Sequence, residues 1–316
     1  MHRHHRGFTI HVRFLSGAVP IAIACLLLLV GAAPVRAQDA ALQAACADLG
    51  RTVPGVAIQI DPQLGIASHI AVPRGILFPR PAQAPGGKAA RSAVHDFLER
   101  HTDLFGGGSE LLNDGVILRD HTDPVTGLRT QVWQQQSDGI PIHRARLVAN
   151  QDRAGNLLTI GSRFVPRLEQ APAAKQARTA LVAQPPHDAA WALAWAIAAQ
   201  HPAADITGIS RAQATQGPSL TQELAAPAVK GTATAQLTWY AASATKLRLA
   251  WKVIFTARAD GRMYEYVVDA QDGTVLYNGR PTTSDSFRWR GRDHRVVTIK
   301  VANLGGPNVS YTLRTN

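Results

Sequence analysis

The hydrophobic period of this chain changes from that of a helix to that of a strand twice along its length, and this repetition constrains the fold most. In each half, apolar residues recur at steps of three and four, which places them on one face of a helix. These residues are Ala90, Ala93, Val94, Phe97 and Leu98 in the first half and Trp191, Ala194, Trp195 and Ala198 in the second. Alternating apolar and polar residues follow each helix and indicate antiparallel strands with one buried face. The sequence therefore predicts an α+β fold of two successive helix-plus-sheet modules.

Turn-forming residues separate the expected strands. In the first half we expect strands at Val116–Leu118, Leu128–Gln136, Ile142–Ala149 and Leu157–Val165, joined by turns at Asp123–Gly127, Asp138-Gly139 and Asp152–Gly155. In the second half we expect strands at Leu247–Phe255, Tyr264–Asp269 and Thr274–Tyr277, joined by turns at Ala259–Gly261 and Gln271–Gly273. Antiparallel strands that follow a single helix predict a curled sheet around that helix. Both modules are therefore expected to be cystatin-like and arranged in tandem.

Helix ends are marked by glycine, aspartate and proline. Gly106–Gly108 is expected to end the first helix, because glycine readily takes the left-handed conformation found after a last turn. The second helix is expected to begin after Asp188, an N-cap residue, and to end before Pro202.

These boundaries divide the chain into modules. We expect the first module at 88–166 and the second at 187–280, divided near Pro166–Pro186. Residues 38–87 are rich in Ala, Pro and Gly, and are expected to form a loosely structured lead-in with one or two edge strands. Residues 203–233 are expected to form a loop.

The first 37 residues have the layout of a secretory signal peptide: a basic start, the apolar run Ala18–Val30 and a small-residue exit at Ala37. An uncleaved membrane anchor and a lipoprotein signal at Cys25 are the alternatives. Pro20 and the small-residue exit favour cleavage, because a stable span needs ~20 apolar residues. Cys25 lies in the middle of the apolar run, where a lipidated cysteine is not expected. We therefore expect secretion, extracellular or periplasmic, without a stable membrane anchor.

The charge balance argues against nucleic acid as a partner. The chain has 33 Lys+Arg against 22 Asp+Glu, a net charge of +11. Most of the arginines are scattered singly, without the basic block that follows phosphates. Cleavage after Ala37 would leave Cys46 as the single thiol, so no disulfide is expected within the product, and Cys46 is expected to be an incidental thiol.

No catalytic motif is present. His-Glu-x-x-His, which brings two imidazoles and a carboxylate to one helix face for zinc, is absent, and so is Gly-x-Ser-x-Gly. Gly106–Ser109 lacks the Lys-Ser/Thr ending of a phosphate loop and is interpreted as a helix stop. No catalytic residue and no metal ligand is therefore predicted in this chain.

Three weaker patterns are interpreted structurally. His143, Arg144 and Arg146 offer an anion-binding pattern, but exposed strand positions in a basic protein explain them equally well. Asp120, His121 and Asp123 offer a cation site, and turn formation explains Asp123. The spacing of Trp191, Trp195 and Trp251 predicts core residues.

Four segments of the first module resemble the FTP module, the fungalysin/thermolysin propeptide motif. They are Asp103–Gly106, the Gln-rich strand Leu128–Gln136, Ser137-Asp-Gly-Ile-Pro-Ile-His143 and Asn156–Leu158. The resemblance implies that Trp133, Gln135, Gly139 and Pro141 build the sheet. His143-Arg144 departs from the small residue that family members often carry after this turn.

Two segments of the second module resemble the PepSY module, which follows FTP in the same precursors. They are Leu249-Ala-Trp-Lys-Val253 and Tyr266-Val-Val-Asp-Ala-Gln-Asp-Gly-Thr-Val-Leu276. Trp251, Asp269 and Gly273 carry this resemblance, which implies structural roles for them.

Residues 281–316 resemble the start of a thermolysin-type catalytic domain. Gly291–Ile299 and Val309–Thr315 are expected to form its first hairpin, with a turn at Asn303–Pro307. The processing junction would lie between Thr282 and Arg292, kept exposed by Arg288, Arg290 and Arg292.

The resemblance implies the propeptide region of a secreted thermolysin-family zinc metalloendopeptidase precursor, which assists folding of the protease and inhibits it. The chain itself would lack the catalytic site and hold no cofactor, since zinc is expected only in the catalytic domain beyond Asn316. That cognate catalytic domain would be the partner, in cis or in trans. A free-standing exported inhibitor or binding protein of the PepSY/FTP type is the alternative, and FTP alone does not separate thermolysin from fungalysin.

Overall fold

The computed structural model describes residues 33–73, 75–80, 92–166, 172–213, 215–280, 285–290 and 296–301. The chain forms two compact units, Met1–Ala41 and Leu42–Asn316. Of the first unit only the start of helix α2 (Ala33–Thr52) is described. The expected signal-peptide run Ala18–Val30 lies outside the described residues. Within the described residues, no helix has both the length and the apolar character needed to cross a membrane.

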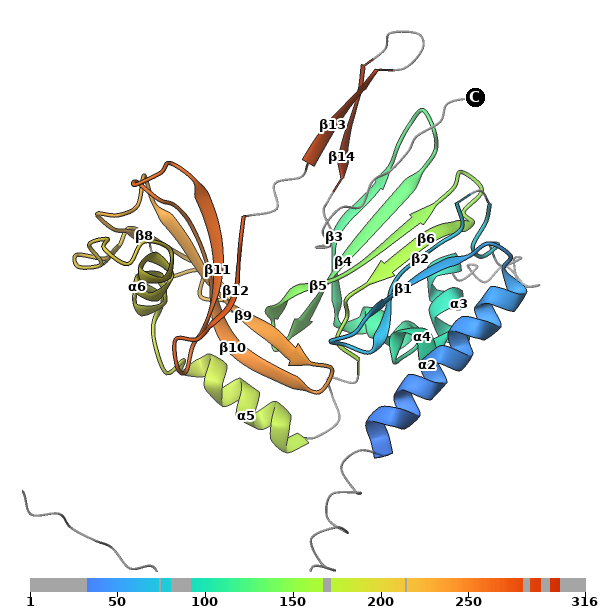
Figure 1. Ribbon diagram of the computed structural model, residues 1–316, viewed down its shortest axis with the longest axis horizontal. Helices are drawn as coiled ribbons and strands as arrows, with labels where there is room; N and C mark the ends of the chain where they lie inside the picture. The colour runs from blue at the N-terminus through green and yellow to red at the C-terminus, as the bar shows by residue number, and fades with distance from the viewer. Residues whose placement is uncertain are drawn as a thin grey trace, which may run out of the picture. The chain divides into compact units, whose positions relative to one another are not determined.

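The second unit contains two successive groups of helices and strands, followed by a hairpin (Figure 1). The first block contains β1 (Ala57–Asp61), β2 (Ile66–Ala71), α3 (Ala93–Arg100), α4 (Thr102–Phe105), the 3-10 helix η1 (Ser109–Asp114), β3 (Gly115–Thr122), β4 (Arg129–Ser137), β5 (Ile140–Gln151) and β6 (Leu157–Ser162). The second contains α5 (Pro172–Ala183), α6 (Ala189–Gln200), β7 (Ser210–Arg211), β8 (Gln222–Ala225), β9 (Ala233–Ser243), β10 (Lys246–Thr256), β11 (Met263–Asp269) and β12 (Val275–Gly279). β13 (Asp285–Arg290) and β14 (Val296–Val301) follow as a separate hairpin. The α+β prediction is confirmed.

The strands β1 to β12 form one continuous sheet. In its first part the order is β3-β4-β5-β6-β2-β1, and every pair is antiparallel. In its second part β9-β10-β11-β12 are antiparallel, and β8 and β7 extend from β9. A parallel pairing of β5 with β9, at Ile142 and Trp239, joins the two parts. The turns expected at Asp123–Gly127, Asp138-Gly139, Asp152–Gly155, Ala259–Gly261 and Gln271–Gly273 are all present between strands.

The first hydrophobic cluster lies between the first part of the sheet and α3. Ala93, Val94, Phe97 and Leu98 are buried on one face of α3, which confirms the stripe predicted over those residues. Ser92 caps this helix by accepting a hydrogen bond from the backbone N–H of His95. The helix α3 ends earlier than expected, at Arg100, and the predicted glycine stop instead ends α4: Gly106 takes the left-handed conformation, φ 69°, and Pro166 leaves no room there for a side chain.

Of the lead-in expected at 38–87, the strands are present and β1 is an edge strand, but the region is not loosely structured up to Ala71. This region contains most of α2 together with β1 and β2, and β2 lies inside the sheet between β1 and β6. Leu42 and Leu49 of α2 and Ile70 of β2 are buried in the first cluster. The error arose from composition: alanine is the best helix former, so an Ala-rich segment with leucines seven residues apart favours an amphipathic helix.

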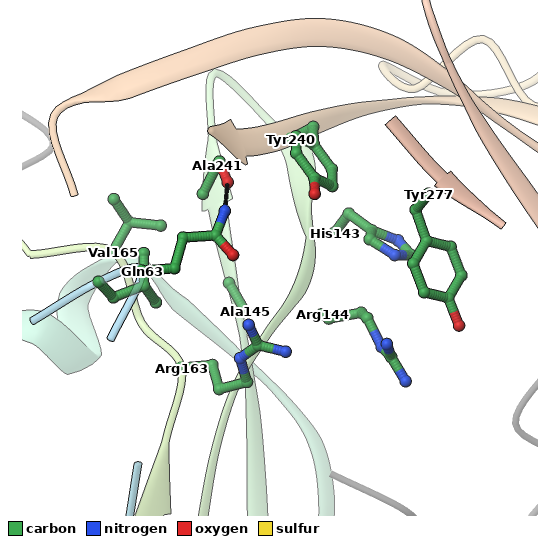
Figure 2. Close-up of a pocket in the computed structure, with 10 residues that line it drawn as sticks. Gln63, His143, Arg144, Ala145, Arg163, Val165, Tyr240, Ala241 and Tyr277 are labelled. Atoms are coloured by element: carbon green, nitrogen blue, oxygen red, sulfur yellow. Dashed lines mark hydrogen bonds between the residues drawn. The ribbon is translucent and has the colours of Figure 1, made fainter. Parts of the chain in front are cut away.

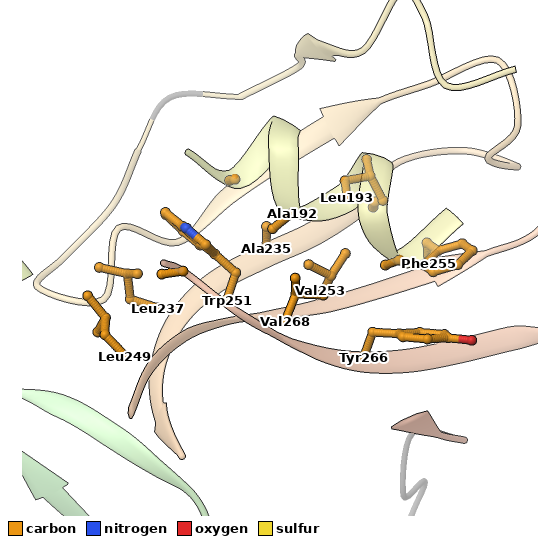
Figure 3. Packing of buried hydrophobic residues seen from close by; sticks show 14 of the residues in the cluster. Ala192, Leu193, Ala235, Leu237, Leu249, Trp251, Val253, Phe255, Tyr266 and Val268 are labelled. Carbon is orange, nitrogen blue, oxygen red and sulfur yellow. The ribbon is translucent and has the colours of Figure 1, made fainter. Parts of the chain in front are cut away.

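The second hydrophobic cluster contains α6 and shows that the predicted helix face was wrong. Ala189, Ala192, Leu193, Ala196 and Ile197 are buried, whereas Trp195 is 46% exposed and Trp191 is half-buried. Figure 3 shows Ala192 and Leu193 on the side of α6 that faces the strands. The small alanines let the helix approach the sheet closely, which leaves the tryptophans at its margin. Trp251 is buried, as predicted.

The two tryptophans of α6 instead lie over the β11–β12 turn at Gly273. Gly273 has φ 76°, and a Cβ there would lie 2.8 Å from Trp195 Cε2 and 2.9 Å from Trp191 Cη2. We expect Gly273→Ala to lower the free energy of unfolding by about 2 kcal/mol, part from the left-handed backbone and part from this overlap. Gly261→Ala is the matched control, because Gly261 has φ 69° and nothing within 4 Å of an added Cβ. Urea denaturation measures both, and equal losses would contradict the packing role of Gly273.

Several other elements differ from the expectation. The expected divide near Pro166–Pro186 contains α5, and the expected loop at 203–233 contains β7 and β8. Gln222 and Leu224 of β8 are buried. At the C-terminal end β14, which contains the end of Gly291–Ile299, pairs with β13. The expected partner strand Val309–Thr315 and the turn at Asn303–Pro307 lie outside the described residues.

Candidate functional site

A large bulge in β5 shapes the candidate site. Between the pairs Gln134–Arg146 and Gln136–Pro141, β4 contributes Gln135 alone, whereas β5 contributes Ile142, His143, Arg144 and Ala145. Arg144 takes φ 58° there, a left-handed conformation that costs a non-glycine residue about 1 kcal/mol or more. The bulge ends the regular pairing of β4 with β5 and turns Ile142 toward β9.

Side-chain amides of β4 hold this bulge in place. Gln134 is buried, and its Nε2 donates to the carbonyls of Ile142 at 2.7 Å and Ala145 at 3.0 Å. These carbonyls have left the β4–β5 ladder, so the amide replaces a strand partner.

Gln135 does the same for the segment after β6. Its Oε1 accepts from the Val165 N–H at 2.7 Å, and its Nε2 donates to the Val165 carbonyl at 3.0 Å. The side chain is fully buried. One amide thus pairs both backbone groups of Val165, which borders the site.

The residues just before the bulge contact β9. Thr238 Oγ1 donates to the carbonyl of Pro141 at 2.8 Å, and Trp239 Nε1 donates to the carbonyl of Ser137 at 3.2 Å. The preceding two-residue turn has positive φ at both Asp138 and Gly139, which favours glycine at the second position. The Asp-Gly-Ile-Pro sequence therefore docks the hairpin against β9.

A cavity of about 190 Å³ opens beside the bulge. Its polar lining comes from five segments of the second unit: Gln63 between β1 and β2, His143 and Arg144 in the bulge, Arg163 after β6, Tyr240 on β9 and Tyr277 on β12. Figure 2 shows His143 beside Tyr277 and the hydrogen bond from Gln63 to the Ala241 carbonyl, which is 2.7 Å long.

His143 is buried at this cavity, so its interpretation as an exposed strand residue is wrong. Its side chain is 5% exposed, and within the described residues Nε2 has no hydrogen-bond partner. Burial, the larger cause, and the positive charges of Arg144, Lys252, Arg163 and Arg146 together lower the pKa of His143 to about 3. The imidazole is therefore neutral at physiological pH, and Glu265, 3.8 Å from Nε2, is a neighbour rather than an ion-pair partner.

Cationic groups surround the cavity. The Arg144 guanidinium lies over the Tyr277 ring, 4.7 Å from its centroid, and has no carboxylate partner among the described residues. Arg163 Nε contacts Asp61 Oδ2 at 3.0 Å. Burial lowers the pKa of Lys252, and the Glu265 carboxylate partly offsets that effect. The arrangement suits a negatively charged group.

A second candidate surface is the edge strand β3. Within the described residues β3 pairs only with β4, so its other edge has no strand partner. Val116, Ile117 and Leu118 are 47%, 54% and 53% exposed. An apolar edge strand is suited to pair with a strand of another protein.

Residues 114–164 match the Fungalysin/Thermolysin Propeptide Motif. This FTP segment begins at the last residue of η1 and contains β3 to β6, including the Gln-rich strand and the bulge. The resemblance found in the sequence is thus confirmed for this part of the chain. No curated protein matches the sequence. A solved structure, the Bacillus megaterium YpeB C-terminal domain, aligns over 75% of this chain and 95% of its own at 9% identity and a TM-score of 0.28, too low to show a shared fold.

Of the residues singled out from the sequence, those in the FTP segment lie in or near the bulge hairpin. Trp133 is buried in the first cluster. Gln135 and Pro141 make the hydrogen bonds given above, and Gly139 lies at the turn next to Pro218. None of these four lines the cavity.

The residues singled out after the FTP segment are spread over the second part of the sheet and beyond. Trp251 Nε1 donates to the His187 carbonyl at 2.9 Å. Asp269 Oδ1 accepts from the Gln271 and Asp272 N–H groups, and Arg248 pairs with Oδ2 at 2.6 Å. Arg288 and Arg290 lie on β13, and Arg292 is outside the described residues.

The contacts of Asp120, Asp123 and Cys46 are those of residues that stabilise the fold. Asp120 binds Arg129 through two hydrogen bonds, which hold the pKa of Asp120 below its usual value, and Asp123 accepts from two turn N–H groups. Among the described residues no group of three His, Cys, Asp or Glu is placed to hold a metal. Cys46 packs, half-buried, against the first cluster.

Sequence reasoning missed the residues that reach the cavity from outside the FTP hairpin. Gln63, Tyr240 and Tyr277 belong to separate strands or turns with no local motif, and only the register of the sheet brings them together. Gln134 had one usable signal, its place in a run of three glutamines within a predicted strand.

Proposed function

We propose that this chain is the propeptide region of a secreted thermolysin-family zinc metalloendopeptidase precursor, where it assists folding of the catalytic domain and inhibits it. The observation that carries this proposal is the match of residues 114–164 to the propeptide motif. The exposed apolar edge of β3 lies within that segment and offers a surface for the catalytic domain. The zinc would be held by the catalytic domain.

The rest of the proposed organisation follows from the sequence. The chain would be secreted through residues 1–37, with FTP-like and PepSY-like modules of cystatin type at 88–166 and 187–280. Processing would take place near Arg288, Arg290 and Arg292. The helix and strands now seen at 38–87 would belong to the first module, because they complete its sheet and its hydrophobic cluster.

A folding role has a physical basis. A protease whose strands pair over long sequence distances folds slowly, since loop closure precedes the contacts that stabilise the fold. A prefolded partner with an open strand edge can bind and order such strands.

The test mixes the purified chain with a thermolysin-type zinc endopeptidase. We expect dose-dependent inhibition of peptide cleavage and a severalfold higher recovery of activity when the denatured protease is refolded with the chain present. If the chain neither inhibits nor improves refolding, the proposal is wrong.

Ile117→Lys tests the β3 surface. Ile117 is 54% exposed, so the fold tolerates lysine, but a buried ammonium at the interface should weaken inhibition about tenfold or more. Met263→Lys is the matched control, since Met263 is a similarly exposed apolar residue on β11 and 48% exposed. Equal effects of the two variants would exclude β3 as the contact surface.

A further inference from the structure

We propose that the cavity beside the β5 bulge binds an anionic group, a carboxylate or a phosphate, through His143 and Arg144. This site is independent of the β3 surface and of the proposed protease partner. Four observations carry it: the charge around the cavity, an unpaired buried nitrogen, the backbone conformation of the bulge, and the existence of the cavity itself.

The charges facing His143 are mostly positive. Arg144 and Arg146 come from β5, Arg163 from the segment after β6 and Lys252 from β10. The carboxylates in this region are Asp61, which engages Arg163, and Glu265, whose Oε1 lies 3.8 Å from His143 Nε2, beyond hydrogen-bond distance, and whose charge acts on Lys252. Arg144 is left with only the face of Tyr277 as a partner among the described residues. An anion in the cavity would supply the missing negative charge.

The unpaired nitrogen is His143 Nε2. A buried polar atom without a hydrogen bond destabilises a fold, so such atoms are rare in native proteins. In the described residues Nε2 has none, although the side chain is more than nine-tenths buried at the cavity. An oxygen of a bound anion would accept the Nε2 proton.

The bulge explains why two adjacent residues reach one site. In a regular strand, successive side chains point to opposite faces. Here His143 and Arg144 both contact the Tyr277 ring, with centroid distances of 4.9 Å and 4.7 Å. The left-handed conformation of Arg144 makes this possible. Backbone strain at an arginine that has no carboxylate partner among the described residues points to a binding role.

The experiment titrates the full chain with sodium phosphate and, separately, sodium acetate, by calorimetry at ionic strength held constant with sodium chloride. Arg144→Gly is the test variant, because glycine accepts the left-handed backbone and removes the guanidinium. Arg262→Gly is the control, since Arg262 is an exposed arginine that lies outside the cavity. Loss of one charge-assisted hydrogen bond should weaken binding roughly tenfold to a hundredfold in Arg144→Gly only.

A second readout is the imidazole of His143, followed by NMR. A bound anion should raise the pKa of His143 in the wild-type chain, and should do so less in Arg144→Gly. If Arg144→Gly does not fold, His143→Gln provides the calorimetric test. Tighter binding of acetate identifies a carboxylate ligand, and tighter binding of phosphate identifies a phosphate group; either supports the site. Absence of binding by both probes, or equal weakening in both arginine variants, would overturn it.

Discussion

Replacing Gln135 by leucine is expected to lower the free energy of unfolding by about 4 kcal/mol. Leucine has a similar volume, so the change removes hydrogen bonds more than packing. It leaves the Val165 N–H and carbonyl, now paired with the Gln135 amide, without partners in a buried position. Each unpaired buried group costs about 1–3 kcal/mol.

The neighbouring Gln136→Leu is the control. Gln136 is half-buried in the same strand, so leucine there should change the free energy of unfolding by less than about 1 kcal/mol. Urea denaturation of the two variants measures the difference. Equal stability of Gln135→Leu and the wild type would show that Val165 finds other partners.

The stability of the chain should fall at acid pH because of His143, and His143→Phe should remove that part of the fall. The pKa of His143 is lowered from 6.5 to about 3 in the folded chain, so the unfolded chain binds more protons between these values. The free energy of unfolding therefore has its full value above 6.5, the pKa of His143 in the unfolded chain, and decreases as the pH falls toward about 3, its pKa in the folded chain. Between about pH 7 and pH 4 the loss amounts to about 3 kcal/mol.

The measurement is the free energy of unfolding of both chains across this range. His69 and His101, whose pKa values burial also lowers, keep their contribution in both, so the difference isolates His143. His121→Phe, on exposed β3, is the control for replacing a histidine by phenylalanine. A His143→Phe chain that lost stability as steeply as the wild type would show that His143 is accessible to protons in the folded state.

Local sequence signals predicted the elements whose contacts are near in the chain. The apolar stripe of α3, the N-caps Ser92 and Asp188 and the Asp-Gly turns depend on residues within one turn of each other. Of these, the cap at Asp188, the turns and the stripe were expected, and all three are present. Helix α2 had such a signal in Leu42 and Leu49, but the Ala-rich composition was misinterpreted.

The sequence by itself determined the α+β class, the strand order of β3 to β6 and the propeptide motif at 114–164, since hydrophobic period and turn residues act locally. Only the tertiary structure decided which face of α6 is buried, that β5 joins β9, and that His143 lies beside an arginine-lined cavity. These features depend on contacts between residues far apart in the chain. A histidine at a strand position has the same local pattern whether a distant strand covers it or water does.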